Sequence, residues 1–183
     1  MTSETDRSFG TRLGHAGLAE AFAYWAELAR EGTPAYRAFD PIRIPALLPH
    51  LQVYRRMPDG GLRIDLAGES VADLIGRNNS GRLLSDILPP QPYAERAVLF
   101  ERAMVDGMPV AYRSVVAIAT REHVLQKRVL MPFVENGPAA DLVLAMVVGL
   151  RMSLQDFEVG GHSPGLRDVI HARPEDIPGR TRR

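Results

Sequence analysis

Apolar residues near the start of the chain recur at spacings of three and four, which is the period of an amphipathic helix. Leu18, Phe22, Trp25 and Ala29 fall on one face of that helix. The pattern predicts a helix over residues 13–31, ended by the Gly-Thr-Pro sequence that follows. The polar residues before it, 1–12, are predicted to be disordered.

Two short segments in the middle of the chain have the alternating pattern of a half-buried β-hairpin. They cover residues 51–57 and 62–67, and a Pro-Asp-Gly-Gly turn separates them. In the second segment Leu62, Ile64 and Leu66 are expected to share one face.

Helical segments are predicted next, followed by three longer strands. The helical segments are 69–75, 83–88 and 93–105, and the strands are 110–120, 124–134 and 141–150. The last strand is apolar on both faces, which predicts a central position with cover on both sides. Residues 152–183 lose this periodicity and are predicted to be a tail with one short helix near 166–171.

This order of elements predicts an α+β domain over residues 13–151. The hairpin and the three long strands would form one five-stranded antiparallel sheet, with the short helices on one face. The helix at 13–31 would cover the other face, supplied either by the same chain or by a second copy in a dimer.

Four sequence elements resemble those of a PAS-like family of alphaproteobacteria. Tyr24-Trp25 matches an aromatic pair in its leading helix, and residues 40–51 resemble its DP..IP.LLP.L element. Residues 66–69 are similar to its LAGT element, with Glu69 in place of Thr, and residues 76–82 resemble its GRDLTGR loop. The resemblance covers about residues 21–151 and implies a PAS fold and a sensory or regulatory role.

Composition narrows the possible partners and compartments. The 22 basic and 22 acidic side chains cancel, which argues against a broad electrostatic surface for nucleic acid or membranes. The chain has no cysteine, so disulfides and Cys-ligated metals are excluded. The longest apolar run, 142–150, is far shorter than the about 20 residues of a membrane span, and no signal peptide is expected from the polar residues 1–12. A cytoplasmic protein is expected.

No catalytic motif is present, and the protein is not expected to be an enzyme. There is no GxSxG elbow and no HExxH sequence. No cofactor is expected, although a PAS fold can hold haem through one axial histidine, for which His50 or His123 are the candidates. Tyr54, Arg113 and His123 are the polar residues that an enzymatic pocket would use.

The predicted function is that of a stand-alone PAS-like sensory or regulatory module. It would act in trans through protein–protein contacts, as a homodimer and with an unidentified partner, and an apolar pocket could hold a small molecule. The alternatives are a small enzyme on a cone-like α+β fold with an open pocket and a ligand-free structural interaction domain. The dimer-face candidates are Leu18, Phe22, Trp25 and Ala29. The ligand-pocket candidates are Tyr54, Leu66, Ile75, Arg77, Asn78, Leu84, Met104, Tyr112, Met131 and Met146, with Asn79 beside Arg77 and Asn78 at the pocket mouth.

Overall fold

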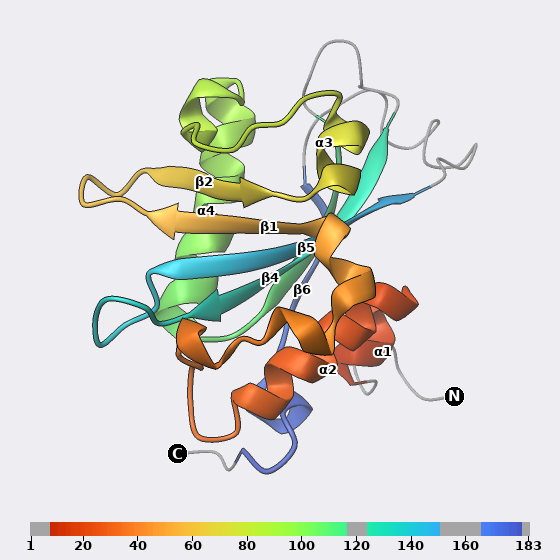
Figure 1. The fold of residues 1–183 in the computed structure, drawn as a ribbon, viewed down its shortest axis with the longest axis vertical. Coiled ribbons are helices and arrows are strands. Elements are labelled where there is room, and N and C mark those ends of the chain that lie inside the picture. The colour runs from red at the N-terminus through yellow and green to blue at the C-terminus, as the bar shows by residue number, and fades with distance from the viewer. Residues whose placement is uncertain (1–7, 117–123, 151–165, 181–183) are drawn as a thin grey trace.

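The computed structural model describes residues 8–116, 124–150 and 166–180, which form one antiparallel sheet with helices on both faces (Figure 1). The six strands lie in the order β2-β1-β5-β4-β3-β6. The predicted α+β class is confirmed, but the predicted sheet lacked the strand β6. The strands are β1 (Leu51–Arg56), β2 (Leu62–Ala67), β3 (Val110–Val115), β4 (Leu125–Phe133), β5 (Leu142–Leu150) and β6 (Leu166–His171).

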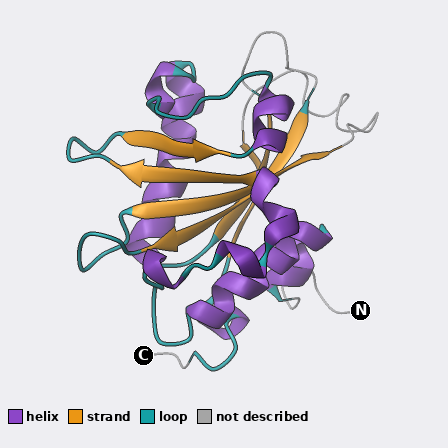
Figure 2. Ribbon diagram, viewed as in Figure 1, coloured by secondary structure: helices purple, strands orange, loops and turns teal. Residues whose placement is uncertain are grey.

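The helices form two layers, one on each side of the sheet (Figure 2). The long helix α4 and the short α3 and η5 pack on one face, whereas α1, α2 and the turns η2–η4 pack on the other. The α-helices are α1 (Phe9–Leu13), α2 (Ala16–Leu28), α3 (Glu69–Ile75) and α4 (Pro90–Asp106). The 3₁₀ turns are η2 (Tyr36–Ala38), η3 (Pro41–Arg43), η4 (Pro45–His50), η5 (Leu84–Asp86) and η6 (Pro174–Asp176).

The strand β5 is buried on both faces, as its apolar pattern predicts, and it lies between β1 and β4. Successive side chains of a strand point to opposite faces. Leu144 and Met146 therefore belong to the core beneath α2, while Val143 and Ala145 belong to the core beneath α4. One strand thus supplies both hydrophobic layers.

The helix α2 packs on the sheet of its own chain, which is one of the two arrangements left open by the sequence. Trp25 is 1% exposed and its indole nitrogen donates to the Pro132 carbonyl oxygen of β4 at 2.9 Å. The other three residues predicted to form a dimer face, Leu18, Phe22 and Ala29, are also buried in this core. In this structure they are core residues and present no surface to a partner.

A β-bulge in the first hairpin changes the face on which Leu66 lies. The pairing runs from Tyr54 opposite Ile64 to Val53 opposite Leu66, so one residue of β2 is extra. Leu66 therefore shares the face of Val53 and is 50% exposed, whereas Ile64 is buried on the other face. The prediction that Leu62, Ile64 and Leu66 share one face was wrong at its last position.

Both ends of the described chain have more structure than the sequence predicts. Residues Phe9–Leu13 form α1, and all of them except Leu13 belong to the stretch expected to be disordered. Residues Leu166–His171, expected to be a helix in a tail, form β6 and pair antiparallel with β3. The buried Asp176 joins these ends, because its carboxylate accepts from the Phe9 backbone N–H at 2.7 Å and lies 3.8 Å from Arg12.

We expect His171, at the end of β6, to make folding stability depend on pH. Burial lowers its pKa below the usual 6.5, the positive charges of Arg102 and Arg12 lower it further, and Asp106 opposes them. Below pH 6.5 the unfolded chain then binds more protons than the folded one. The free energy of unfolding is therefore highest above pH 6.5 and falls as the pH drops below it. Urea midpoints at about pH 7.5 and 5.5 measure this loss, which should shrink in His171→Asn. An unchanged loss in His171→Asn would contradict the assignment, and His15→Asn is the matched control.

Candidate functional site

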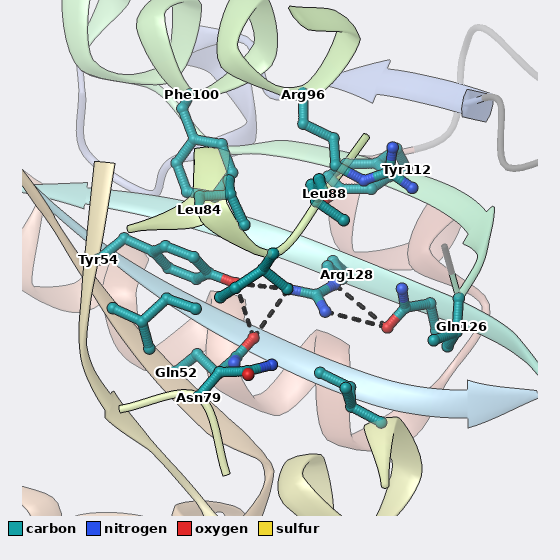
Figure 3. A pocket seen from close by; sticks show the side chains of 14 residues that line it. Gln52, Tyr54, Asn79, Leu84, Leu88, Arg96, Phe100, Tyr112, Gln126 and Arg128 are labelled. Atoms are coloured by element: carbon teal, nitrogen blue, oxygen red, sulfur yellow. Dashed lines mark hydrogen bonds between the residues drawn. The ribbon is translucent and has the colours of Figure 1, made fainter. Parts of the chain in front are cut away.

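A small cavity lies between the sheet and the layer formed by α3, η5 and α4 (Figure 3). Its volume is about 40 Å³. That space admits about three water molecules, whereas pockets for drug-sized ligands measure about 300–1,000 Å³. The cavity can therefore hold only a very small ligand unless the surrounding helices move.

Polar and apolar side chains both line the cavity, and the part formed by the polar ones is called the polar wall. The polar wall combines residues of β1, β3, β4, α4 and the loop after α3, and several of them are buried. The polar side chains are Gln52, Tyr54, Asn79, Arg96, Tyr112, Gln126 and Arg128. The apolar side chains are Ile64, Ile75, Leu84, Ile87, Leu88, Phe100 and Val116.

Arg128 is the centre of a buried hydrogen-bond network (Figure 3). Its Nη1 donates to Gln52 Oε1 at 2.8 Å and to Tyr54 Oη at 2.7 Å. Its Nε and Nη2 both donate to Gln126 Oε1, at 3.3 and 3.0 Å. Tyr54 in turn donates to Gln52 Oε1 at 2.7 Å. Each acceptor is thus fixed by the arginine, and the network orders the polar wall.

The strand pattern explains why these side chains meet. Gln52 and Tyr54 are two residues apart on β1, and Gln126 and Arg128 are two apart on β4, so each pair shares the cavity face. The strand β5 separates β1 from β4, and Ala145 stands opposite Gln52 in that strand. Its small side chain leaves space for the long arginine to cross β5 toward β1.

Two positive charges enter this cavity from opposite sides. Arg128 is 7% exposed on the sheet, and Arg96 is 4% exposed on α4. Burial lowers the pKa of Arg96, and the repulsion from Arg128 lowers it as well. Burial also opposes the charge of Arg128, but Tyr54 and Tyr112 favour it, and the pKa of Arg128 is raised overall. Both side chains stay protonated at neutral pH.

The described part of the lining offers no group suited to proton transfer near neutral pH. Burial raises the pKa of Tyr54 above 10.0, so this phenol stays neutral. No Asp, Glu or His is present among the described residues that line the cavity. General acid–base catalysis needs a group whose pKa lies near the working pH. The arrangement is therefore chemically suited to binding a hydrogen-bond acceptor or an anion.

The structure brings four of the predicted pocket residues together at this cavity: Tyr54, Ile75, Leu84 and Tyr112. Met104 is buried in the adjacent core and lines a separate groove on the outer side of α4.

The other predicted pocket residues lie elsewhere. Met131 and Met146 point to the opposite face of the sheet, in the core beneath α2. Leu66 borders an open apolar groove of about 560 Å³ on that same face. Arg77 and Asn78 are exposed in the loop, where Asn78 Oδ1 accepts from the Ser80 N–H at 2.8 Å and stabilises the turn.

The sequence analysis missed Gln52, Arg96, Gln126 and Arg128, although a signal for three of them was present. Gln52 stands between two apolar residues of β1, and Gln126 and Arg128 occupy alternate positions of β4 with Lys127 between them. Such positions on a covered face indicate a buried polar network. Asn79, predicted at the pocket mouth, is instead 2% exposed and lines the cavity itself.

The residues around the cavity do not fit a haem group. His50 lies in η4 and is not among the lining residues, and His123 lies outside the described residues. A cavity of about 40 Å³ has no space for a macrocycle. No cluster of three or more His, Cys, Asp or Glu side chains suited to a metal occurs within residues 8–116, 124–150 and 166–180.

Comparison with known proteins identifies the fold family. Within the described part of the chain, no helix is long and apolar enough to cross a membrane. No curated protein matches the sequence. A protein family described as PAS domain matches residues 13–148, which is well over half of the chain, and the chain therefore belongs to the PAS domain family.

Proposed function

We propose that this protein is a sensory module in which a small ligand occupies the cavity beneath α3 and α4. PAS domains are generally sensory or signalling modules and are usually non-catalytic. The observation that carries the proposal is the buried polar wall, with Arg128 hydrogen-bonded to Gln52, Tyr54 and Gln126 beside open space. A core that served packing alone would not need a charged network beside a cavity, because burying charge is costly.

An enzyme on the same fold is the second candidate, and the polarity of the cavity is the observation that favours it. Shifted pKa values in a cleft are typical of catalytic sites. Here, however, the pKa of Tyr54 is shifted farther above neutral pH, so its phenol stays uncharged. Arg96 and Arg128 stay positively charged. These groups position and neutralise acceptors, and they do not exchange protons at neutral pH. The arrangement thus supports binding over catalysis.

Native mass spectrometry of the purified protein, with an absorbance spectrum of the same sample, tests the proposal. We expect a bound mass that disappears in Leu84→Phe, because the larger ring fills the apolar end of the cavity lined by Leu84. Overpacking of this kind costs about 1–3 kcal/mol, which leaves a folded protein for comparison.

Val98→Phe is the matched control, since Val98 lies on the outer side of α4 and is 65% exposed. It should keep the bound mass. Equal masses for the protein and both variants, with no ligand in any of them, would instead favour a ligand-free interaction domain.

Signal output through contact with another protein is part of the same proposal. A homodimer would use residues other than Leu18, Phe22, Trp25 and Ala29, because these four are buried within one chain. Sedimentation velocity with and without the bound ligand measures whether occupancy changes the state of association. A monomer under both conditions would direct the search to a different partner protein.

A further inference from the structure

An asparagine in the loop after α3 is buried at the cavity with one of its polar atoms unsatisfied. Asn79 is 2% exposed, and it is one of the residues that line the cavity in Figure 3. Its Oδ1 is buried and accepts no hydrogen bond in the described structure. A buried acceptor without a donor destabilises the fold, and a ligand that donates to this atom would remove that cost. Asn79 therefore marks the point at which the cavity would hold a ligand.

Backbone hydrogen bonds on both sides hold Asn79 in this position. The Gly81 N–H donates to the Ile64 carbonyl oxygen of β2 at 2.7 Å, and the Ile64 N–H donates to the Arg82 carbonyl oxygen at 2.9 Å. The Arg82 N–H in turn donates to the Asn79 carbonyl oxygen at 3.2 Å. The preceding residue, Asn78, is exposed to solvent. The loop therefore directs one asparagine outward and the next one into the cavity.

The polar wall offers a hydrogen-bond donor to the same ligand. Among the described residues, Arg128 donates to Gln52 and to Tyr54 once each and to Gln126 twice. A guanidinium group carries about five N–H donors, so one on Nη2 remains for a ligand. A ligand that both donates to Asn79 and accepts from Arg128 would satisfy the two groups. A hydroxyl group can do both, because it has one donor and two lone pairs.

The apolar part of the lining suits a short alkyl group. Leu84, Leu88 and Phe100 border the cavity together with the polar wall. A buried water molecule needs about two to four polar partners, and these three side chains supply none. The volume of about 40 Å³ admits about three or four heavy atoms. The space therefore favours a very small molecule with one polar group and an alkyl remainder over water alone.

We propose that this cavity binds a short-chain alcohol, whose hydroxyl group donates to Asn79 Oδ1 and accepts from Arg128. The alkyl group lies against Leu84, Leu88 and Phe100. An alcohol brings one donor, which matches the unpaired acceptor among the described lining residues. A ketone of the same size has no donor and leaves Asn79 unsatisfied. This inference rests on the proposed sensory function and names its ligand class.

Propan-2-ol and acetone test the inference, because they have the same number of heavy atoms and only the alcohol can donate a hydrogen bond. Each is titrated into isotopically labelled protein while NMR follows the backbone amides and the side-chain amide of Asn79. Ligands of this size reach a Kd of about tens of micromolar at best, so the titration extends to millimolar concentrations. We expect saturable shifts at the cavity with propan-2-ol. The Kd of acetone should be at least about tenfold higher, because Asn79 stays unpaired.

A variant at Asn79 decides whether the preference for the alcohol arises at this residue. Asn79→Leu removes the acceptor and keeps a side chain of similar size, so the preference for propan-2-ol over acetone should disappear. Arg77→Leu is the matched control, since it places the same residue at an exposed position of the same loop. It should keep the preference. The comparison of the two ligands on the unmodified protein stays decisive even where Asn79→Leu fails to fold.

Equal Kd values for the two ligands, or a preference that persists in Asn79→Leu, would overturn the inference. Shifts that rise linearly without saturation would show that the alcohol acts as a solvent only, and they would overturn it as well. A different molecule found by native mass spectrometry, without saturable binding of propan-2-ol, would overturn the alcohol site and leave the sensory function standing. Neither alcohol binding nor a bound mass would overturn both.

Discussion

Replacing Trp25 with alanine is expected to lower the free energy of unfolding by about 3–5 kcal/mol. The indole is 1% exposed and holds α2 against the sheet, with Phe22 stacked beside it at 6.4 Å between ring centroids. Truncation leaves a cavity and removes the hydrogen bond to the Pro132 carbonyl. That carbonyl then loses its indole donor, which adds to the cost.

Urea unfolding followed by circular dichroism measures the effect, because Trp25 is the single tryptophan and its fluorescence is lost in the variant. Glu20→Ala, an exposed change on the same helix, should alter stability by less than about 0.5 kcal/mol. A loss below about 1 kcal/mol in Trp25→Ala would mean that α2 is not anchored on this sheet.

Replacing Gly68 with alanine is expected to cost about 2–4 kcal/mol, although only one methyl group is added. Gly68 connects β2 to α3 and packs directly against the backbone of η4. A Cβ atom there would lie 2.7 Å from the Leu48 carbonyl oxygen and closer still to the Pro49 carbonyl. Because the neighbouring atoms are backbone, no side-chain rotation can relieve the clash.

The same substitution should also act on the cavity. Moving the start of α3 away from η4 displaces Ile75, which lines the cavity at the end of that helix. We therefore expect Gly68→Ala to weaken ligand binding as well as folding, which calorimetry and urea unfolding measure separately. Gly137→Ala is the matched control, since a Cβ atom at Gly137 meets nothing within 4 Å. Equal stability of the two variants would contradict the close packing of α3 on η4.

Predictions from the sequence were most accurate for strands that are buried on both faces and for elements bounded by residues with a strong preference for turns. The apolar run that became β5 predicted its central place, and the bounds predicted for α3 match those observed. The strand β6 was missed because it is an edge strand whose exposed and half-buried positions show no regular alternation. This segment is a strand because it pairs with β3, and a local sequence pattern does not reveal such long-range pairing.

The candidate site was predicted in part, and the errors have one physical origin. Tyr54 and Tyr112 lie at the cavity, because each alternates along its strand with residues of the opposite core. Met131 and Met146 were assigned to the pocket from their chemistry, without the register that puts them beneath α2. Arg128 was overlooked because charged residues are mostly found at surfaces, and only the neighbouring strands show that its position is covered.

Along β4 and β5, successive side chains point to opposite faces of the sheet. Natural selection could therefore act separately on the cavity face and on the face that packs against α2. In β5 the even-numbered Leu144 and Met146 support the α2 layer, whereas the odd-numbered Val143 and Ala145 belong to the layer of the cavity. A lineage could therefore exchange residues on one face to recognise a new ligand while the opposite face preserves the fold. Neighbouring residues of one strand could then evolve independently, with one residue altering ligand recognition and the next preserving the stability of the fold.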